Sequence, residues 1–182
     1  AGATIVLHMH YTTNGKAQRD RSSIGLKFAM EEVDREVATR GIYNLNFEIP
    51  AGAEDYEIRS EFTPREDIEI LTFFPHMHTR GKSWKYLLHQ PDGSVKTLLS
   101  VSRYDFNWQE SYILKKPILV PKGAKIECVA VYDNSEKNYA NPDPTKPVKW
   151  GEQTWEEMMI GYIDWVKPQK AEAAAARSDT LD

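Results

Sequence analysis

The chain of 182 residues has a single cysteine, Cys128, so it forms no intrachain disulfide and no zinc site built on several cysteines. No run of about 18 apolar residues occurs, which excludes a transmembrane helix. The 23 basic side chains are outnumbered by 27 acidic ones and form no basic block, so we expect no electrostatic nucleic-acid binding. No Gly-rich phosphate loop and no nucleophile–base arrangement is present either.

The composition of the chain is sufficient for a hydrophobic core, and its turn residues are spaced as in a β protein. Hydrophobic residues make up 41% and aromatic residues 11%, enough for a sizeable core. Turn signals such as Pro91-Asp92-Gly93 separate short β-rich segments. We therefore predict an all-β fold, an antiparallel β-sandwich or jelly roll with about nine or ten strands. The predicted strands cover residues 4–12, 24–29, 43–49, 56–62, 68–74, 84–89, 95–101, 111–114, 125–132 and 158–165.

Three segments depart from this pattern. Residues 30–39 have helical propensity, but β segments flank them, and an extended connection is slightly favoured over a helix. Residues 118–123 are typical of a strand edge followed by a turn. Residues 134–155 are rich in Pro and Asn and lack periodicity, and loops of that length in compact domains tend to be functional.

Histidine is scarce and unevenly placed. Four of the five histidines lie in two copies of one tripeptide, His8-Met9-His10 and His76-Met77-His78. In a strand, residues i and i+2 point to the same face, roughly 6.6–7 Å apart, so each pair could offer two imidazoles to one metal. Imidazole suits copper, zinc, iron and nickel, and a thioether in the same shell selects copper, especially Cu(I). One such pair is usually two polar residues on a solvated face, but two copies favour a ligand role.

The other candidate ligands are weaker. His89 precedes a Gln-Pro-Asp turn and is interpreted as a surface residue. Asp105, Asp133 and Glu157 are candidate carboxylates, but each lies in a turn or at a strand edge, where a solvated charge is the default. Cys128 lies in an apolar run and is most simply a small buried hydrophobe.

Residues 74–82, Phe-Pro-His-Met-His-Thr-Arg-Gly-Lys, resemble the second copper site of the copper type II, ascorbate-dependent monooxygenases. This family includes peptidylglycine α-hydroxylating monooxygenase and dopamine β-monooxygenase. Its pattern His-x-His-x-x-Gly-Lys supplies two copper ligands, and a methionine in a late strand supplies the third. Residues 156–162 are similar to the family's Glu-Glu-Met segment. The resemblance therefore implies copper bound by His76, His78 and Met158, although an unassisted Met is usually a core residue.

The beginning of the chain is similar to another part of the same family. Residues 5–11 resemble the strand that ends the first catalytic domain, where a His before Tyr is the third ligand of the other copper. That ligand maps onto His10, with His8 as a further candidate, but the His-His pair that completes the family's site does not occur here. The resemblance implies a jelly-roll domain over residues 1–166, whose residues 1–12 belong to an upstream partner domain, and a solvated tail over 167–182.

The chain also departs from the family pattern. Family members carry a Cys after the ligand Met, bonded to one in an earlier strand; here Met159 takes that place, and the resemblance implies that Cys128 is the unpaired partner. An Arg and an Asn of the peptide-hydroxylating enzyme are replaced by Phe74 and Ile160, so a peptide carboxylate would lose its anchoring charge. Tyr162 matches a substrate-contacting Tyr. A peptidylglycine substrate is therefore disfavoured, and a more apolar one is left open.

These resemblances imply a copper-binding domain of a copper-dependent monooxygenase-like protein, which in the parent protein activates O₂ and hydroxylates a C–H bond. The implied partners are a small-molecule substrate and an external reductant, and the implied setting is extracytoplasmic (periplasmic or secreted) in a bacterium. No catalytic residue beyond the metal ligands is expected, and the incomplete second site leaves open whether the chain itself is an enzyme.

Two alternative functions are compatible with the sequence. One is a non-catalytic jelly-roll module that binds copper or another ligand. The other is a carbohydrate-binding sandwich, for which exposed aromatic side chains would be needed. Its candidate residues are Trp84, Trp108, Trp150 and Trp155.

Overall fold

A computed structural model describes residues 2–11 and 14–169 of the chain. It divides into two compact units, Ala1–Val33 and Asp34–Asp182. In the described part of the first unit no residue belongs to a strand or helix, so the strands predicted at 4–12 and 24–29 are wrong for the residues described. The physical reason is that β-rich composition forms a strand only where another backbone completes its hydrogen-bond ladder.

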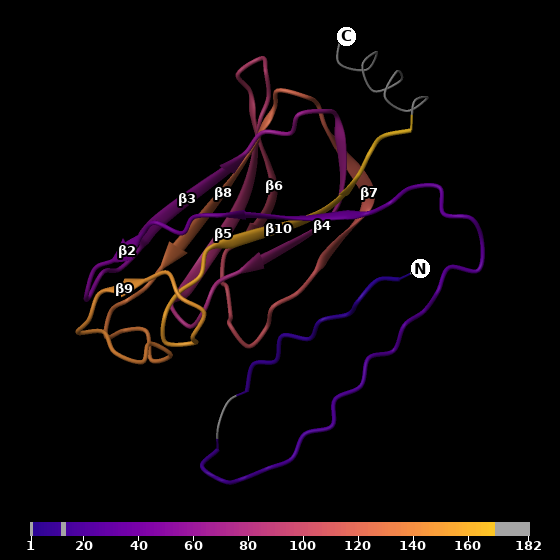
Figure 1. Cartoon of the computed structure of the whole chain (residues 1–182). Coiled ribbons are helices and arrows are strands. Elements are labelled where there is room, and N and C mark those ends of the chain that lie inside the picture. The colour runs from indigo at the N-terminus through magenta and orange to yellow at the C-terminus, as the bar shows by residue number, and fades with distance from the viewer. Residues whose placement is uncertain (1, 12–13, 170–182) are drawn as a thin grey trace. The chain divides into compact units, whose positions relative to one another are not determined.

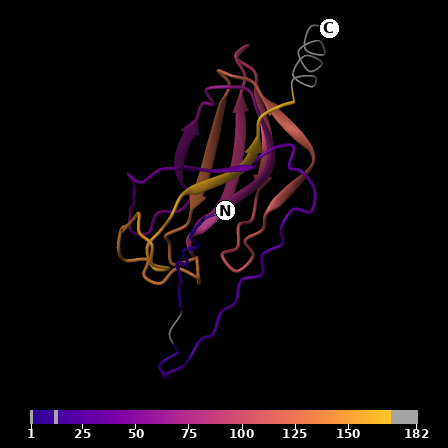
Figure 2. The ribbon, with the colours of Figure 1, turned by 45° about the vertical axis from the view of Figure 1, so that its right-hand side comes forward.

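The second unit is built of ten β-strands, and none of its described residues is helical. The strands form two four-stranded antiparallel sheets, in the orders β1-β10-β4-β7 and β3-β8-β5-β6, and a two-stranded sheet β2-β9 (Figure 1, Figure 2). The predicted all-β antiparallel sandwich is confirmed. Its strands are β1 (Ala38–Tyr43), β2 (Glu48–Ile49), β3 (Tyr56–Phe62), β4 (Ile68–His76), β5 (Gly81–His89), β6 (Val95–Val101), β7 (Tyr112–Val120), β8 (Lys125–Tyr132), β9 (Val148–Lys149) and β10 (Ile160–Val166).

Most strand positions follow the sequence pattern, and the differences lie at the ends. β3, β6 and β8 have the predicted bounds. β4 continues through the predicted end to His76, and β7 continues through residues 115–120, beyond a predicted end at 114. The segment predicted as one strand over 43–49 is split, because β1 ends at Tyr43 and only Glu48–Ile49 pairs again, with β9.

The connection from 134 to 155 is a long irregular loop, as predicted, apart from the two residues of β9. Its start is anchored by Asn134, which is fully buried and donates to the carbonyls of Pro50 and Lys146, both at 2.9 Å. The described residues include no helix of the length and apolarity that a membrane crossing requires. The predicted tail lies mainly outside the described residues, since the description ends at 169.

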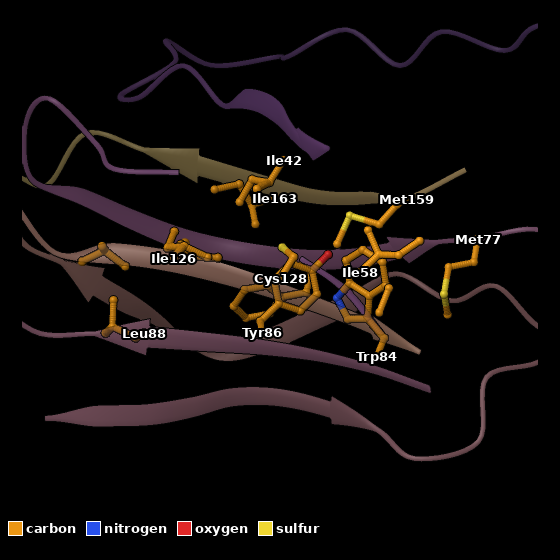
Figure 3. Close-up of a cluster of buried hydrophobic side chains, with 14 of the residues drawn as sticks. Ile42, Ile58, Met77, Trp84, Tyr86, Leu88, Ile126, Cys128, Met159 and Ile163 are labelled. Carbon is orange, nitrogen blue, oxygen red and sulfur yellow. The ribbon is translucent and has the colours of Figure 1, made fainter. Parts of the chain in front are cut away.

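The core lies between the two four-stranded sheets and includes the lone cysteine. Cys128 is fully buried among Trp84, Tyr86 and Met159 in the hydrophobic cluster drawn in Figure 3. Burial raises the pKa of the Cys128 thiol, which keeps it protonated. Ser60 faces Cys128 across β3 and β8, and its hydroxyl donates to the Met159 sulfur at 3.2 Å. The prediction that Cys128 is a small buried hydrophobe is confirmed.

Candidate metal centre

His76 ends β4 and projects from the side of its sheet that faces away from the core. Its partner across the antiparallel ladder is Ile160, the first residue of β10. The next residues along the two segments, Met77 and Met159, are fully buried in the core. Because successive side chains of a strand alternate between its faces, His76 and Ile160 point outward.

His78 lies in the turn between β4 and β5 and is buried, with 5% of its surface exposed. The centroids of the His76 and His78 rings are 5.4 Å apart, and the ring planes are nearly perpendicular, at 84°. The structure therefore places the two imidazoles of this tripeptide side by side.

Hydrogen bonds determine which nitrogen of each ring is free. The Gln109 amide donates to the Phe106 carbonyl at 2.9 Å, which turns its own carbonyl oxygen toward His76 Nδ1 at 2.7 Å. His78 Nδ1 lies 3.1 Å from the carbonyl oxygen of Glu156. Both partners only accept, so each neutral ring carries its proton on Nδ1 and keeps the lone pair on Nε2. Metal-binding histidines usually donate their other N–H in this way.

Met158 lies two positions before Ile160, the first residue of β10 and the one that pairs with His76. Its carbonyl accepts a hydrogen bond from the Tyr132 hydroxyl at 2.7 Å. The side chain of Met158 is partly exposed, whereas Met159 is fully buried. Of the two methionines, Met158 is therefore the one whose thioether lies outside the core.

The sequence predicts a solvated charge at Glu157, and this prediction is wrong. The residue is fully buried, and its two carboxylate oxygens accept the backbone N–H groups of His78 at 2.8 Å and Arg80 at 2.7 Å. Burial raises the pKa of Glu157 to about 7, although these donors act in the opposite direction. The solvated interpretation does hold for Asp105, which is exposed and accepts the N–H of Asn107 at 2.8 Å.

Burial also lowers the pKa of His76 and His78 below 6.5, and for His78 the neighbouring His76 ring acts in the same direction. The contacts of His76 with Gln109 and of His78 with the backbone of Glu156 and Gln153 oppose this shift. In metal-free protein, we expect imidazole NMR titrations of both rings to have midpoints below pH 6.5. Since the folded state disfavours the protonated rings, their contribution to stability is present above pH 6.5 and is lost as the pH falls through the lowered values. A midpoint at or above 6.5 for either ring would contradict the buried, neutral pair.

A shallow hollow of about 190 Å³ lies on the same outward side of the sheet. Phe74 and Tyr162 face each other across β4 and β10 inside it, with ring centroids 6.0 Å apart. The Thr39 hydroxyl donates to Asp164 at 2.6 Å, and none of the described residues that line the hollow is cationic. The lining consists of Thr39, Thr72, Phe74, Ser111, Tyr162 and Asp164.

The other predicted site residues lie elsewhere. His8 and His10, both exposed in the first unit, have their Nε2 atoms 3.2 Å apart. His89 lies at the far end of β5 and is 2.7 Å from a Glu127 carboxylate oxygen. Among the described residues, no cluster of three or more His, Cys, Asp or Glu side chains could hold a metal ion. His76 and His78 are the two candidate ligands that the structure places side by side.

The aromatic residues considered for carbohydrate binding divide into two groups. Trp84 is fully buried, so the prediction that it belongs to an exposed carbohydrate-binding surface is wrong. Its side chain instead fills part of the hydrophobic core. Trp108 and Trp155 are exposed, and Trp150 is partly buried. Among the described residues no ring contact joins these three, and Trp150 packs edge-on against Phe47, with ring centroids 6.5 Å apart.

No curated protein matches this chain. Of solved structures, 21 chains match. One is the infectious bursal disease virus VP2 subviral particle (11% identity, 73% of this chain and 32% of that chain covered, TM-score 0.35). Another is the infectious bursal disease virus Gx strain (13% identity, 85% and 47% covered, TM-score 0.32). The chain thus spans less than half of either, and such low scores do not bear on function.

The comparison of the sequence with protein families identifies the family of this chain. Residues 40–180 match the C-terminal domain of the copper type II ascorbate-dependent monooxygenases, and this range contains the His76–His78 pair, Gln109 and Met158. The chain therefore belongs to the copper type II ascorbate-dependent monooxygenase family, as a C-terminal domain.

Proposed function

We propose that His76, His78 and Met158 bind copper and that the domain serves a copper-dependent monooxygenase. The observation that carries this proposal is the pair of Nδ1 hydrogen bonds, to Gln109 and to the Glu156 carbonyl, which leaves an Nε2 lone pair on each of two adjacent neutral rings. The partly exposed thioether of Met158 would make the donor set soft enough to favour Cu(I).

The residues around this donor set have distinct tasks. When bound, copper supplies one-electron redox chemistry with dioxygen, and the family's name makes ascorbate the expected reductant. Gln109 and Glu156 orient the imidazoles, and the outward placement of His76 leaves the donor set open to a substrate on the sheet surface. His10, or His8 in its place, would be a ligand of the second copper in the parent protein, together with histidines from an upstream domain.

The hollow beside β10 is where we place a small-molecule substrate. Phe74 and Tyr162 form an aromatic wall on the same side of the sheet as His76. Because Asp164 is the one charged residue among the described residues of its lining, an apolar or aromatic substrate is favoured over one that ends in a carboxylate.

A copper(I) titration of the full chain against a competing chromophoric chelator tests the proposal. We expect one tight site whose X-ray absorption spectrum shows nitrogen and sulfur scatterers, retained when His8 and His10 are both changed to alanine. A site without sulfur, or one that disappears in the His8→Ala/His10→Ala variant, would refute the assignment. Oxygen consumption with ascorbate then separates an enzyme from a non-catalytic copper-binding module.

Replacing Gln109 by leucine is expected to lower the copper(I) affinity by about 10-fold, the lower end of the effects seen when a partner of a ligating histidine is removed. The leucine cannot accept the proton of His76 Nδ1, so the ring loses its orientation and its tautomer preference. The matched control is Gln90→Leu in the turn after β5, for which we expect the wild-type affinity. Equal affinities of the two variants would remove Gln109 from the site.

A further inference from the structure

The two segments that carry the copper donors are joined by a reciprocal set of hydrogen bonds. The Glu157 carboxylate accepts the backbone N–H groups of His78 and Arg80, at 2.8 and 2.7 Å. In return, the Arg80 guanidinium donates to the Trp155 carbonyl at 3.0 Å. Arg80 is 2% exposed and Glu157 is fully buried, so water cannot substitute for any of these contacts.

These bonds begin where the sheet ladder stops. The pairing of β4 with β10 ends at His76 opposite Ile160, so neither His78 nor Met158 is held by strand pairing. The backbone of Glu157 is itself anchored, since its N–H donates to the Lys149 carbonyl at 3.2 Å and its carbonyl accepts the Gly151 N–H at 3.0 Å. The carboxylate thus connects an anchored segment, next to Met158, directly to the turn that carries His78.

We propose that Glu157 is the positioning residue of the copper centre: its carboxylate sets where the His78 imidazole stands relative to the Met158 thioether. This inference rests on the proposed copper site. Without the carboxylate, His76 and His78 remain neighbours on one short segment, and the thioether on the other segment is the donor that is lost. The expected consequence is a copper centre that keeps its nitrogen ligands and loses its preference for Cu(I).

The test uses Glu157→Gln in the full chain, with Glu152→Gln as the matched control, because Glu152 is exposed and lies in the same loop. Glutamine has the same size, but only one of its two terminal atoms can accept an N–H, so one of the two bonds that connect Glu157 to the turn carrying His78 is lost. We expect copper(I) affinity to fall by about 10- to 100-fold, the range for removal of an outer-shell partner, with loss of sulfur scattering. Zinc(II) affinity, which depends on the imidazoles, should change by less than about 3-fold.

A double-mutant cycle separates positioning from general support of the fold. If Glu157 acts through the thioether, Glu157→Gln has little further effect on copper(I) affinity once Met158 is leucine. Effects that add, or a Glu157→Gln protein that keeps its sulfur scatterer and its affinity, would overturn the inference. Should Glu157→Gln not fold, Glu157→Asp keeps both acceptor oxygens on a shorter stem and is expected to show a smaller loss of the same kind.

A metal-free measurement distinguishes failure of this inference from failure of the copper assignment. With methyl-labelled methionine, Glu157→Gln should shift the Met158 methyl resonance of the metal-free protein while leaving the resonances of Met77 and Met159 in place. An unmoved Met158 signal overturns the positioning role even if wild-type protein binds copper through sulfur. Absence of sulfur scattering in the wild-type protein overturns the copper assignment instead.

Discussion

Changing His78 to alanine is expected to reduce the copper(I) affinity of this chain by more than about 100-fold, since loss of an outer-shell partner alone costs about 10- to 100-fold and a ligand contributes more. The imidazole is buried, and its Nδ1 is held by the Glu156 carbonyl, so its Nε2 lone pair is already oriented in the metal-free protein. The third histidine of the second unit, His89, pairs with Glu127 at the other end of β5 and cannot replace it. Competition with a copper(I) chelator measures the change.

His89→Ala is the matched control for this prediction. It removes an imidazole at the end of β5 that is far from His78, and should leave copper(I) affinity unchanged while it removes the contact to Glu127. Comparing unfolding midpoints of both variants shows whether either loses its fold. A folded His78→Ala protein that binds copper(I) as tightly as the wild type would exclude His78 as a ligand.

A second large effect, on stability, is expected for Gly161→Ala in β10. A Cβ atom at this position would lie 2.5 Å from Cys128 Sγ, 2.8 Å from Trp84 Cζ2 and 2.9 Å from Tyr86 Cε1. All three side chains are fully buried, and the Tyr86 hydroxyl is fixed by its bond to the Tyr162 carbonyl at 3.1 Å. The two sheets must therefore move apart, which should cost about 3 kcal/mol. At about 2–4 °C per kcal/mol, the thermal midpoint should fall by roughly 6–12 °C.

Gly41→Ala on the neighbouring strand β1 is the control for this effect. A Cβ atom there would approach Ile160 Cγ2 at 3.3 Å. It would lie on the face of the sheet that points away from the core, so the neighbouring side chains can adjust. We expect a change below about 1 kcal/mol in the free energy of unfolding. Equal destabilisation by the two substitutions would show that the close contact of Gly161 with the opposite sheet is not what limits its size.

The strands of the second unit could be predicted because alternation along a strand is a local property. β3, with its alternating polar and apolar residues, and β8, rich in β-branched residues, were found with the correct bounds for that reason. Residues 24–29 have similar composition but form no strand. In the part of the chain that the structure describes, no strand pairs with them, and composition cannot predict whether a pairing partner is present.

The donors of the candidate copper site were also accessible without the structure. Two imidazoles at i and i+2 are a local pattern, and alternation separates Met158 from Met159 in any extended segment. Gln109 was not found, because its bond to His76 joins residues 33 positions apart, and no periodicity links them. The burial of Glu157 could not be predicted for the same reason, since its hydrogen-bond partners lie 77 and 79 positions away in the sequence.

Features that depend on neighbouring residues could be predicted from the sequence, whereas features that depend on contacts between distant residues could not. Local backbone geometry and side-chain patterning were enough to indicate an all-β sandwich and a pair of imidazole donors, whereas Met158 was indicated by the resemblance to the family. Folding alone brings acceptors to the two Nδ1 atoms and thereby leaves Nε2 free on His76 and His78. It also buries the Glu157 carboxylate against backbone donors, because desolvation is a property of the whole packed molecule.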